Sequence, residues 1–401
     1  MKAVGLIVEY NPFHNGHAYH LQQAKEISGS DLVIAVMSGN FLQRGEPAIV
    51  SKWYRAKMAL MGGADLVFEL PYRFATQKAE TFANGAISLL DAAGCASICF
   101  GSESGDINAF LKTAGRIETM QNQLDKEIKQ CMKTGISYPK ALSLVYDSVT
   151  DSPDYVNLTM PNNILGYQYI RAIRKQKSHL NPFTIARKSA GYHDEHFASA
   201  TIASATSIRK AIFSNGSKID SFIPSYTKEL LNSYLNEYGQ LHQWEDYWPL
   251  LQFRLLQAAP AELRQIYEME EGIENRLMKA ASQAGSFQEF MEMVKTKRYT
   301  WTRLQRISTH ILTNASKSEM REDEEKASYL RLLGMSEKGK TYLNKEKTKF
   351  SVPVISKLSS YRHKEIDLDI RAARIYAAVL PVKNKKALLQ QEYTQPPIYL
   401  K

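Results

Sequence analysis

Two histidines near the N-terminus, His14 and His17, are the side chains of this sequence best suited to chemistry. They stand in the tetrad His14-Asn15-Gly16-His17, which follows the apolar run Val4–Val8 and a turn and precedes a predicted helix. Free N–H groups at a helix start favour phosphate. Two imidazole donors on one side of the first helical turn could stabilise charge that develops on an α-phosphate or on departing pyrophosphate. Because Gly16 has no side chain, a nucleotide could approach the backbone closely. The tetrad therefore predicts a nucleotide triphosphate site.

Two alternatives to a nucleotide site remain for this histidine pair. A zinc site would need further His, Cys or carboxylate ligands, and no obvious set stands in this segment. The histidines could also be surface residues. No Ser-His-Asp or Cys-His pattern accompanies the tetrad, so we expect chemistry without a covalent enzyme intermediate.

The elements that must position these residues alternate between strands and helices in the first half of the chain. Short apolar runs predict strands at Ala3–Glu9, Leu32–Met37, Leu66–Leu70, Ser97–Gly101 and Phe183–Lys188. Helical patterns cover His17–Ile27, Lys52–Met61, Ala79–Ala93, Asn163–Lys175 and Ser207–Ser214. We therefore expect an α/β fold with a Rossmann-like, doubly wound parallel sheet. Such sheets bind ligands at the carboxyl ends of their strands.

The alternation is interrupted once and then ends, which predicts the domain organisation. Residues 106–155 have helical periodicity, and we expect a helical insertion that lies over the active site. Residues 1–225 would form the ATP-binding catalytic domain, and residues 226–401 a mainly α-helical domain with a small α/β element near its end. The patterns behind this second domain are helical at Trp244–Ala258, Ala261–Ala284 and Phe287–Thr296, and strand-like at Lys349–Ile355.

The composition is that of a soluble, basic protein. Of its 401 residues 44% are hydrophobic and 23% charged, and no apolar run reaches the ~18 residues of a membrane span. The chain begins with a strand-like run and has three cysteines, so we expect no signal peptide and a reducing, cytoplasmic setting. A net charge of +10 favours a polyanionic partner, with nucleic acid the first candidate.

A basic segment in the C-terminal half could contact RNA. Lys295–Lys317 holds six Lys or Arg and no acidic residue, with Tyr299 and Trp301 interleaved. Basic groups contact phosphates, and aromatic rings can stack on unpaired bases. An apolar stripe should face the core, which leaves four candidates for RNA contact: Lys297, Arg298, Arg303 and Arg306. A second basic cluster is Lys383, Lys385 and Lys386. Either group could instead be a plain solvated surface.

Two longer strings resemble one protein family. Gly5–His17 (GLIVEYNPFHNGH) and Met37–Pro47 (MSGNFLQRGEP) resemble the bacterial tRNA(Met) cytidine acetate ligases, and the similarity extends over most of the chain. H-x-G-H by itself is typical of the whole nucleotidyltransferase superfamily related to class I aminoacyl-tRNA synthetases. The two strings together are far more specific. The resemblance implies a nucleotidyltransferase-type fold.

The resemblance also implies roles for residues near the predicted strand ends and helix starts. It favours a substrate-side role for Gly39 and Asn40, and we expect Asn40 to be catalytic together with His14, His17 and Lys52, which could face the site. It implies nucleotide contacts for Ile7, Gly16, His17, Gly101, Asn162, Arg187, Ser207 and Arg209. Ordinary alternatives stand beside several of these residues. Asn40 could simply form a turn and Asn162 cap a helix, while Lys52 and Arg55 could be solvated, which we favour for Arg55.

The segment Ala203–Arg209 resembles the I-S-S-T-x-I-R string of the superfamily, but it has alanine at positions 203 and 205. One hydroxyl is therefore missing, which puts the role of that position in doubt. A Ser/Thr-rich helix cap would explain the remaining hydroxyls equally well, though it explains Arg209 less well.

The function implied by the resemblance is ATP-dependent acetylation of tRNA. Acetate would attack the α-phosphate of ATP, with Mg²⁺ on the triphosphate, to give acetyl-adenylate and pyrophosphate. N4 of the wobble cytidine of elongator tRNA(Met) would then take the acetyl group, forming N4-acetylcytidine. The base that accepts the amino proton and the oligomeric state, which could be a homo-oligomer, stay open.

Two other classes of function are compatible with parts of the sequence. A small-molecule adenylyltransferase of cofactor biosynthesis would use the same histidines, but the large helical C-terminal half argues against it. A non-catalytic RNA-binding module would leave the tetrad unexplained.

Overall fold

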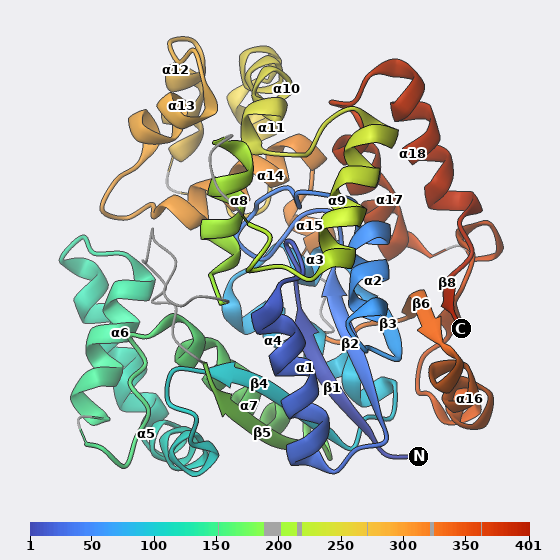
Figure 1. Cartoon of the computed structure of the whole chain (residues 1–401). Helices are drawn as coiled ribbons and strands as arrows, with labels where there is room; N and C mark the ends of the chain where they lie inside the picture. Colours follow the sequence, from blue (N-terminus) through green and yellow to red (C-terminus); the bar gives the residue numbers. More distant parts are fainter. Residues whose placement is uncertain (151, 188–201, 215–218, 271, 321–324, 362) are drawn as a thin grey trace.

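An eight-stranded sheet forms the centre of the computed structural model, which describes residues 1–150, 152–187, 202–214, 219–270, 272–320, 325–361 and 363–401 (Figure 1). The strands are β1 (Ala3–Val8), β2 (Leu32–Ser38), β3 (Leu66–Leu70), β4 (Ser97–Ser102), β5 (Asn181–Ala186), β6 (Leu330–Ser336), β7 (Val354–Ile355) and β8 (Ile398–Leu400). Their order is β5-β4-β1-β2-β3-β6-β7, with β8 beside β6. The five strands β1–β5 are those predicted from the sequence, although the predicted end of the last one, Lys188, lies outside the described residues.

The first five strands pair in parallel, so the predicted doubly wound sheet is confirmed. β1 lies between β2 and β4, and the chain winds outward from β1 in both directions. In such a sheet the point where the strand order reverses leaves a crevice at the carboxyl ends of the strands. The carboxyl end of β1 is therefore where the His14–His17 segment must lie.

Helices cover both faces of this sheet, which explains why its central strands β1 and β2 are apolar along almost their whole length. The N-terminal helices are α1 (Asn15–Ser28), α2 (Lys52–Met61), α3 (Tyr72–Ala75), α4 (Ala79–Ala92), α7 (Pro161–Gln176), α8 (Ala205–Phe213) and α9 (Ser225–Tyr238). Leu21 of α1 shares a core cluster with Val4 of β1. On the opposite face, Ile87 of α4 shares a second cluster with Ile34 of β2. The five helices predicted for this half all form, with ends within two residues of those expected.

The helical insertion forms α5 (Ile107–Lys133) and α6 (Tyr138–Val149). The two helices pack on each other, and α5 also contacts α7 and the edge strand β5. Figure 1 shows the pair beside the sheet rather than across the carboxyl ends of β1 and β2. Our expectation that the insertion lies over the active site is therefore wrong for the central strands, because its apolar side packs against α7 instead.

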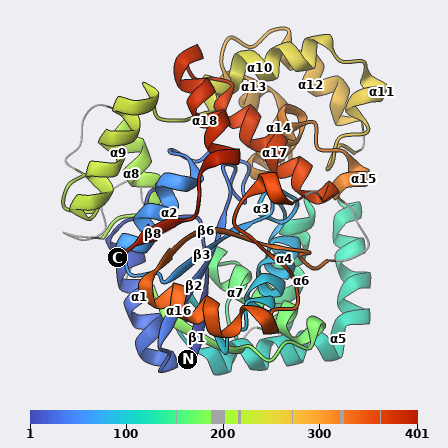
Figure 2. The ribbon, with the colours of Figure 1, turned by 90° about the vertical axis from the view of Figure 1, so that its right-hand side faces the viewer.

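Helices of the C-terminal half lie above the carboxyl ends of the central strands (Figures 1 and 2). The helices of this half are α10 (Trp244–Gln257), α11 (Pro260–Leu263), α12 (Ile273–Ala281), α13 (Phe287–Val294), α14 (Trp301–Thr313), α15 (Lys317–Met320), α16 (Glu337–Glu346), α17 (Lys364–Ala377) and α18 (Val382–Thr394), with 3-10 turns at Lys347–Lys349 and Leu358–Ser360. Their apolar side chains continue the cluster that covers α1 and α2. None of the described helices has the length and apolar character needed to cross a membrane.

Two predictions for this half need correction. The single helix predicted at Ala261–Ala284 is split into α11 and α12, because the chain takes positive φ angles at Glu268 (61°) and Gly272 (76°). The strand-like run Lys349–Ile355 is reduced to the two residues of β7.

The strands of the C-terminal half join the main sheet instead of forming a small element of their own. β6 pairs antiparallel with β3, and β7 and β8 both pair parallel with β6. Figure 2, which views the molecule from the right-hand side of Figure 1, shows β6, β8 and α16 on the face toward the viewer. The last part of the chain is therefore tied to the sheet that carries the histidines.

Candidate active site

The two histidines of the tetrad are held at the start of α1 by backbone N–H groups. His14 is the N-cap residue, and its Nδ1 accepts a hydrogen bond from Gly16 N–H at 3.1 Å. Nδ1 of His17 accepts from His14 N–H at 3.3 Å, and the ring centroids are 3.7 Å apart. Because Nδ1 is an acceptor in both rings, a neutral imidazole must carry its hydrogen on Nε2. The helix start thus holds two Nε2–H donors side by side.

Both rings are neutral at physiological pH. Burial, together with the positive charges of Arg187 and Arg209, lowers the pKa of His14 to about 3. Burial also lowers the pKa of His17 well below its usual value, with smaller effects from His14 and Arg187. The pair can therefore donate hydrogen bonds to developing negative charge, and it does not act as a pair of cations.

Packing against His14 requires a glycine at position 16, in addition to the predicted close approach of a nucleotide. A Cβ at this position would lie 2.9 Å from Cε1 of His14. Any side chain there would displace the His14 ring.

His20, one turn further along α1, was not singled out from the sequence. Burial lowers its pKa to about 4, and its Nε2 is buried without a hydrogen-bond partner among the described residues.

A chain of polar contacts connects the ends of β4 and β5 with the start of α7. Both carboxylate oxygens of Glu103 accept from this helix start, from the backbone and side-chain amides of Asn162 (3.2 and 2.7 Å) and from Asn163 N–H (2.8 Å). Asn162 Oδ1 in turn accepts from Nη1 of Arg187 at 2.9 Å. Glu103 therefore accepts hydrogen bonds from free N–H groups at the start of α7, and Asn162 orients the Arg187 guanidinium. The sequence did not single out Glu103 for this role.

Gly101 of β4 and Ile7 of β1 are also predicted to contact the nucleotide. A Cβ at Gly101 would lie 3.4 Å from the Cγ of Arg187, so the glycine lies against the stem of that arginine. Ile7 is partly buried and packs against the core cluster that contains α4 and α7.

The start of α8 lies close to the start of α1. Ser204 is its N-cap, accepting from Ser207 N–H at 3.0 Å and lying 2.7 Å from the Ser207 hydroxyl. Arg209 donates from Nη1 to Asn11 O (2.9 Å) and from Nη2 to the Glu46 carboxylate (2.8 Å). The capping alternative for these hydroxyls is correct for Ser204. Two helix N-termini and an arginine nevertheless meet at one place, which suits an anion.

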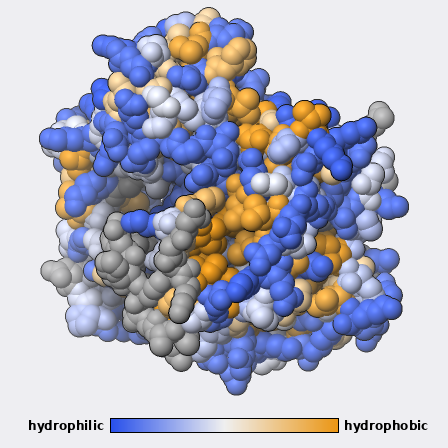
Figure 3. All heavy atoms as spheres, turned by 45° about the horizontal axis from the view of Figure 1, so that its top comes forward, coloured by the Kyte–Doolittle hydropathy of each residue, from blue (hydrophilic) through white to orange (hydrophobic). Residues whose placement is uncertain are grey.

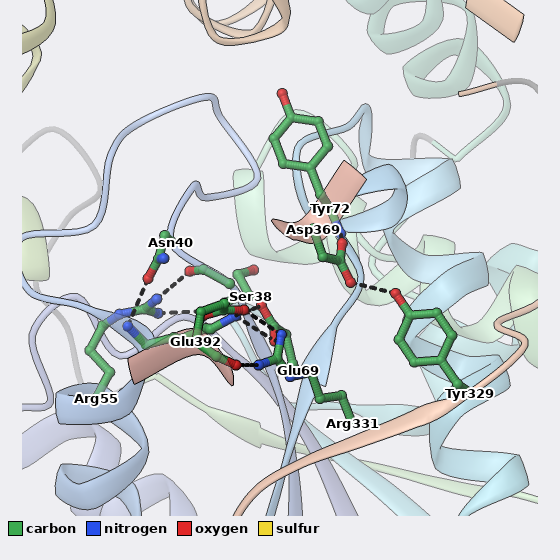
Figure 4. Close-up of polar contacts among 11 residues, drawn as sticks. Ser38, Asn40, Arg55, Glu69, Tyr72, Tyr329, Arg331, Asp369 and Glu392 are labelled. Atoms are coloured by element: carbon green, nitrogen blue, oxygen red, sulfur yellow. Dashed lines mark hydrogen bonds and ion pairs between the residues drawn. The ribbon is translucent and has the colours of Figure 1, made fainter. Parts of the chain in front are cut away.

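Asn40 and Lys52 make contacts inside the fold (Figure 4). Asn40 Oδ1 accepts from Lys52 N–H at 2.9 Å, which secures the start of α2. The Lys52 ammonium is 1% exposed and donates to both oxygens of Glu69 at 2.8 Å and to Glu392 at 2.7 Å. Arg331 of β6 contacts the same two carboxylates. These contacts favour a structural role for Lys52 and Asn40, because a buried charge with two partners is not available to a substrate.

A small cavity adjoins this buried charge cluster. Its volume is about 10 Å³, enough for a single water molecule and too small for acetate. Its lining residues include Gly39, Asn40, Lys52, Glu69 and Asp369. Burial raises the pKa of Asp369 to about 7, aided by the charge of Glu69.

Arg55 is fully buried, so the solvated position favoured from the sequence is wrong. It donates from Nε to Val50 O (3.2 Å), from Nη1 to the carbonyls of Glu9 (2.6 Å) and Ser38 (3.1 Å), and from Nη2 to Gly39 O. Figure 4 shows the guanidinium beneath Asn40 and beside Ser38. Burial lowers its pKa to about 10, so it stays charged. The apolar residues that dominate Lys52–Met61 were a signal that this helix is buried.

Two of the four RNA-contact candidates, Lys297 and Arg298, have exposed side chains. Lys297 and Arg298 lie in the exposed turn between α13 and α14. Arg303 packs over the Tyr299 ring at 4.4 Å and pairs with Glu270 at 3.1 Å.

The other basic and aromatic residues of the segment are used inside the fold. Arg306 is 9% exposed and holds Glu268 with two nitrogens at 2.7–3.2 Å. Tyr299 is 4% exposed, and Trp301 donates to Gln305 at 3.0 Å. These contacts favour structural roles for Arg306 and Tyr299 rather than contact with RNA phosphates and bases.

The described residues contain no group of three or more His, Cys, Asp or Glu side chains that could hold a metal ion.

Comparison with known proteins identifies the family. Residues 1–392 match the family model described as HIGH Nucleotidyl Transferase. The chain is 51% identical over 404 residues to the tRNA(Met) cytidine acetate ligase of Bacillus licheniformis and 48% identical over 405 residues to that of Bacillus subtilis. Each match covers 99% of this chain and 97% of the relative.

Solved structures agree with the sequence relatives. The Thermotoga maritima TmcAL crystal structures, one apo and one bound with alpha-thio ATP, superpose with TM-scores of 0.92 and 0.91. Sequence identity is 34% and 33%, and each match covers the full length of both chains. This chain therefore belongs to the tRNA(Met) cytidine acetate ligase family of HIGH nucleotidyl transferases.

Proposed function

We propose that this protein is an ATP-dependent ligase that acetylates N4 of the wobble cytidine of elongator tRNA(Met). The observation that carries the proposal is the pair of neutral histidines, with two Nε2–H donors at the start of α1, in a chain whose relatives bear that name. Nothing in the described residues favours the alternative, a small-molecule adenylyltransferase.

ATP would lie across the carboxyl ends of β1, β4 and β5. Its adenosine would meet Ile7, Gly101 and Asn162, and its phosphates would lie between the starts of α1 and α8. Arg187 and Arg209, whose positive charges act on His14, would attract the phosphates. Gly16 and Ser207 would complete the contacts. The alpha-thio ATP bound in the Thermotoga relative supports ATP as the nucleotide.

The first chemical step would join acetate to the α-phosphate. A carboxylate oxygen of acetate attacks the α-phosphorus, and the bond to the pyrophosphate oxygen breaks. His14 and His17 donate hydrogen bonds to the negative charge that develops there. When bound to ATP, Mg²⁺ neutralises part of the triphosphate charge. The product is acetyl-adenylate, a mixed anhydride.

The second step would transfer the acetyl group to RNA. The N4 amine of cytidine attacks the acetyl carbonyl carbon, and the bond to the AMP oxygen breaks. The amine is a poor nucleophile because its lone pair is delocalised into the ring, and the reactive anhydride compensates. A wobble base in an anticodon loop is already unpaired, so presenting it costs less than flipping a base out of a duplex.

The tRNA would bind over residues 226–401 in the cytoplasm. The net charge of +10 supports a polyanionic partner. Lys297 and Arg298 have exposed side chains, with Arg303 close by in sequence, and Lys383 and Lys386 of α18 are exposed as well. Figure 3 views the molecule with the top of Figure 1 turned forward, and hydrophobic residues gather near the middle of this largely hydrophilic face. Such a mixture suits a ligand with charged phosphates and apolar bases.

Acetate-dependent exchange of labelled pyrophosphate into ATP tests the first step without tRNA. The wild type should exchange label only when acetate is present, because formation of acetyl-adenylate is reversible. The double variant His14→Ala/His17→Ala should lose exchange while it still folds cooperatively and keeps its affinity for tRNA. Wild-type exchange that does not respond to acetate, or full exchange by the double variant, would overturn the proposal.

A further inference from the structure

Glu9 lies directly after β1, at the centre of the site. β1 separates β4, on the proposed adenosine side, from β2, whose following loop carries Gly39 and Asn40. Nη1 of Arg55 donates to the backbone carbonyl of Glu9 and to that of Ser38, the last residue of β2. Glu9 therefore lies level with the carboxyl end of β2. A group here lies between the nucleotide side and the opposite side of the crevice.

The Glu9 carboxylate differs from the other carboxylates at this edge of the sheet. Glu69 is held by Lys52 and Arg331, Glu103 by the start of α7, and Glu46 by Arg209. In the described parts of the chain, Glu9 makes no ion pair.

The one hydrogen bond to the Glu9 side chain, again among the described residues, runs from Gln43 N–H to Oε1 at 2.9 Å. This bond fixes Oε1, and no hydrogen bond from a described residue occupies Oε2.

The surroundings make this carboxylate a stronger base than an exposed glutamate. Burial raises the pKa of Glu9, and the negative charge of Glu46 raises it further. Gln43 N–H, Arg44 and Arg209 act in the opposite direction without cancelling the rise. Tyr169 of α7 also lies within electrostatic range. A general base is most effective when its pKa lies near the working pH, and this shift moves Glu9 in that direction.

We propose that Glu9 is the catalytic base that takes the proton from N4 of the acceptor cytidine. The assignment rests on the acetyl transfer proposed above. As N4 forms its bond to the acetyl carbon and AMP leaves with the anhydride oxygen, one N4 proton passes to Oε2 of Glu9. A carboxylate also accepts a hydrogen bond from the cytosine amine and repels the O4 of uracil, so the same group would select cytidine.

Glu9→Gln tests this role without removing the contact to the loop, because the amide oxygen can still accept from Gln43 N–H. Single-turnover transfer of labelled acetyl from enzyme-bound ATP and acetate to tRNA should fall about 100-fold or more. Acetate-dependent pyrophosphate exchange should stay within about twofold of the wild type. The wild-type transfer rate should rise with pH through the pKa of Glu9, and the variant should lack that rise. Glu26→Gln, the same change at an exposed position of α1, should alter none of these readouts.

Two results would overturn the assignment. One is transfer by Glu9→Gln within about threefold of the wild type. The other is an equal loss of exchange and transfer, which would indicate that Glu9 only maintains the fold. A wild type without acetate-dependent exchange would contradict the acetyl-adenylate step instead, and Glu9 would still be judged by the rate and pH profile of tRNA acetylation.

Discussion

The chemistry of the two histidines follows from which nitrogen of each ring is occupied. Backbone N–H groups occupy Nδ1 of His14 and His17, so Nε2 must carry the hydrogen. Burial keeps both rings neutral. A neutral donor stabilises charge that develops during the reaction and needs no protonation step of its own. The sequence could predict the residue types and spacing, whereas the protonation state depends on burial and on arginines far along the chain.

His14→Ala removes one of the two donors. We expect the rate of acetate-dependent pyrophosphate exchange at saturating ATP to fall about 100-fold, the usual cost of losing one such donor. The dissociation constant for ATP should change far less. His179→Ala, at an exposed position before β5, is the control and should exchange at the wild-type rate. A His14→Ala enzyme that loses ATP affinity but keeps its maximal rate would contradict the assigned role.

The loop between β2 and α2 connects the sheet to the C-terminal helices. Gly45, with a φ of 83°, presses against the backbone of α14, where a Cβ would lie 2.6 Å from Arg306 N. Its carbonyl accepts from Trp244 Nε1 at 3.1 Å and from the Thr309 hydroxyl at 2.7 Å. The same loop supplies Gln43, which holds Glu9, and Glu46, which holds Arg209. This loop therefore couples the position of the C-terminal helices to the residues at the carboxyl ends of the strands.

Gly45→Ala should test this close approach. The added methyl group meets backbone atoms that cannot move aside and adds left-handed strain, so we expect a loss of about 3 kcal/mol or more in the free energy of unfolding. Gly29→Ala, at a left-handed position with open space, should cost only about 1 kcal/mol. Urea titrations would measure both. Equal losses for the two variants would show that packing against α14 is not tight.

Prediction from the sequence succeeded where structure is local and failed where it depends on distant partners. The first five strands and their helices follow from short apolar runs and helical periodicity. β6 was missed because it contains Arg331, which is buried only because Glu69 and Glu392 meet it from distant parts of the chain. The buried position of Arg55 was misjudged for the same reason. A buried charge cannot be recognised before its partners are in place.

At the scale of the whole molecule, several histidines are buried in neutral form. Burial lowers the pKa of His14 and His242 to about 3 and of His20 and His310 to about 4. Both ring nitrogens of His242 are 2.7 Å from tyrosine hydroxyls. Below the ordinary histidine pKa of about 6.5, the unfolded chain binds protons that the folded protein excludes.

Stability should therefore fall as the pH drops from about 6.5. At pH 5, His242 alone would cost about 2 kcal/mol relative to pH 7.5. The raised pKa values of Asp369 and Glu9 act in the opposite direction, but four histidines outweigh them. Urea unfolding at the two pH values measures the difference. An unfolding free energy at pH 5 equal to that at pH 7.5 would contradict the burial of neutral histidines.

The proposed tRNA surface predicts a salt-dependent effect. Lys297→Glu/Arg298→Glu should weaken tRNA binding about tenfold or more and reduce the dependence of affinity on salt concentration, because phosphate contacts release counterions. Acetate-dependent exchange without tRNA should not change. Lys338→Glu/Lys345→Glu alters charge equally on α16, which lies toward the opposite end of the sheet (Figure 1), and should leave affinity near the wild type. Equal losses in the two variants would point to net charge rather than a defined surface.

Transfer of radiolabelled acetate into tRNA tests the central claim most directly. We predict that the wild type labels tRNA only when ATP is present, that nuclease digestion recovers the label as N4-acetylcytidine, and that His14→Ala/His17→Ala transfers none. ATP consumption with a small metabolite, and no label in RNA, would contradict the account.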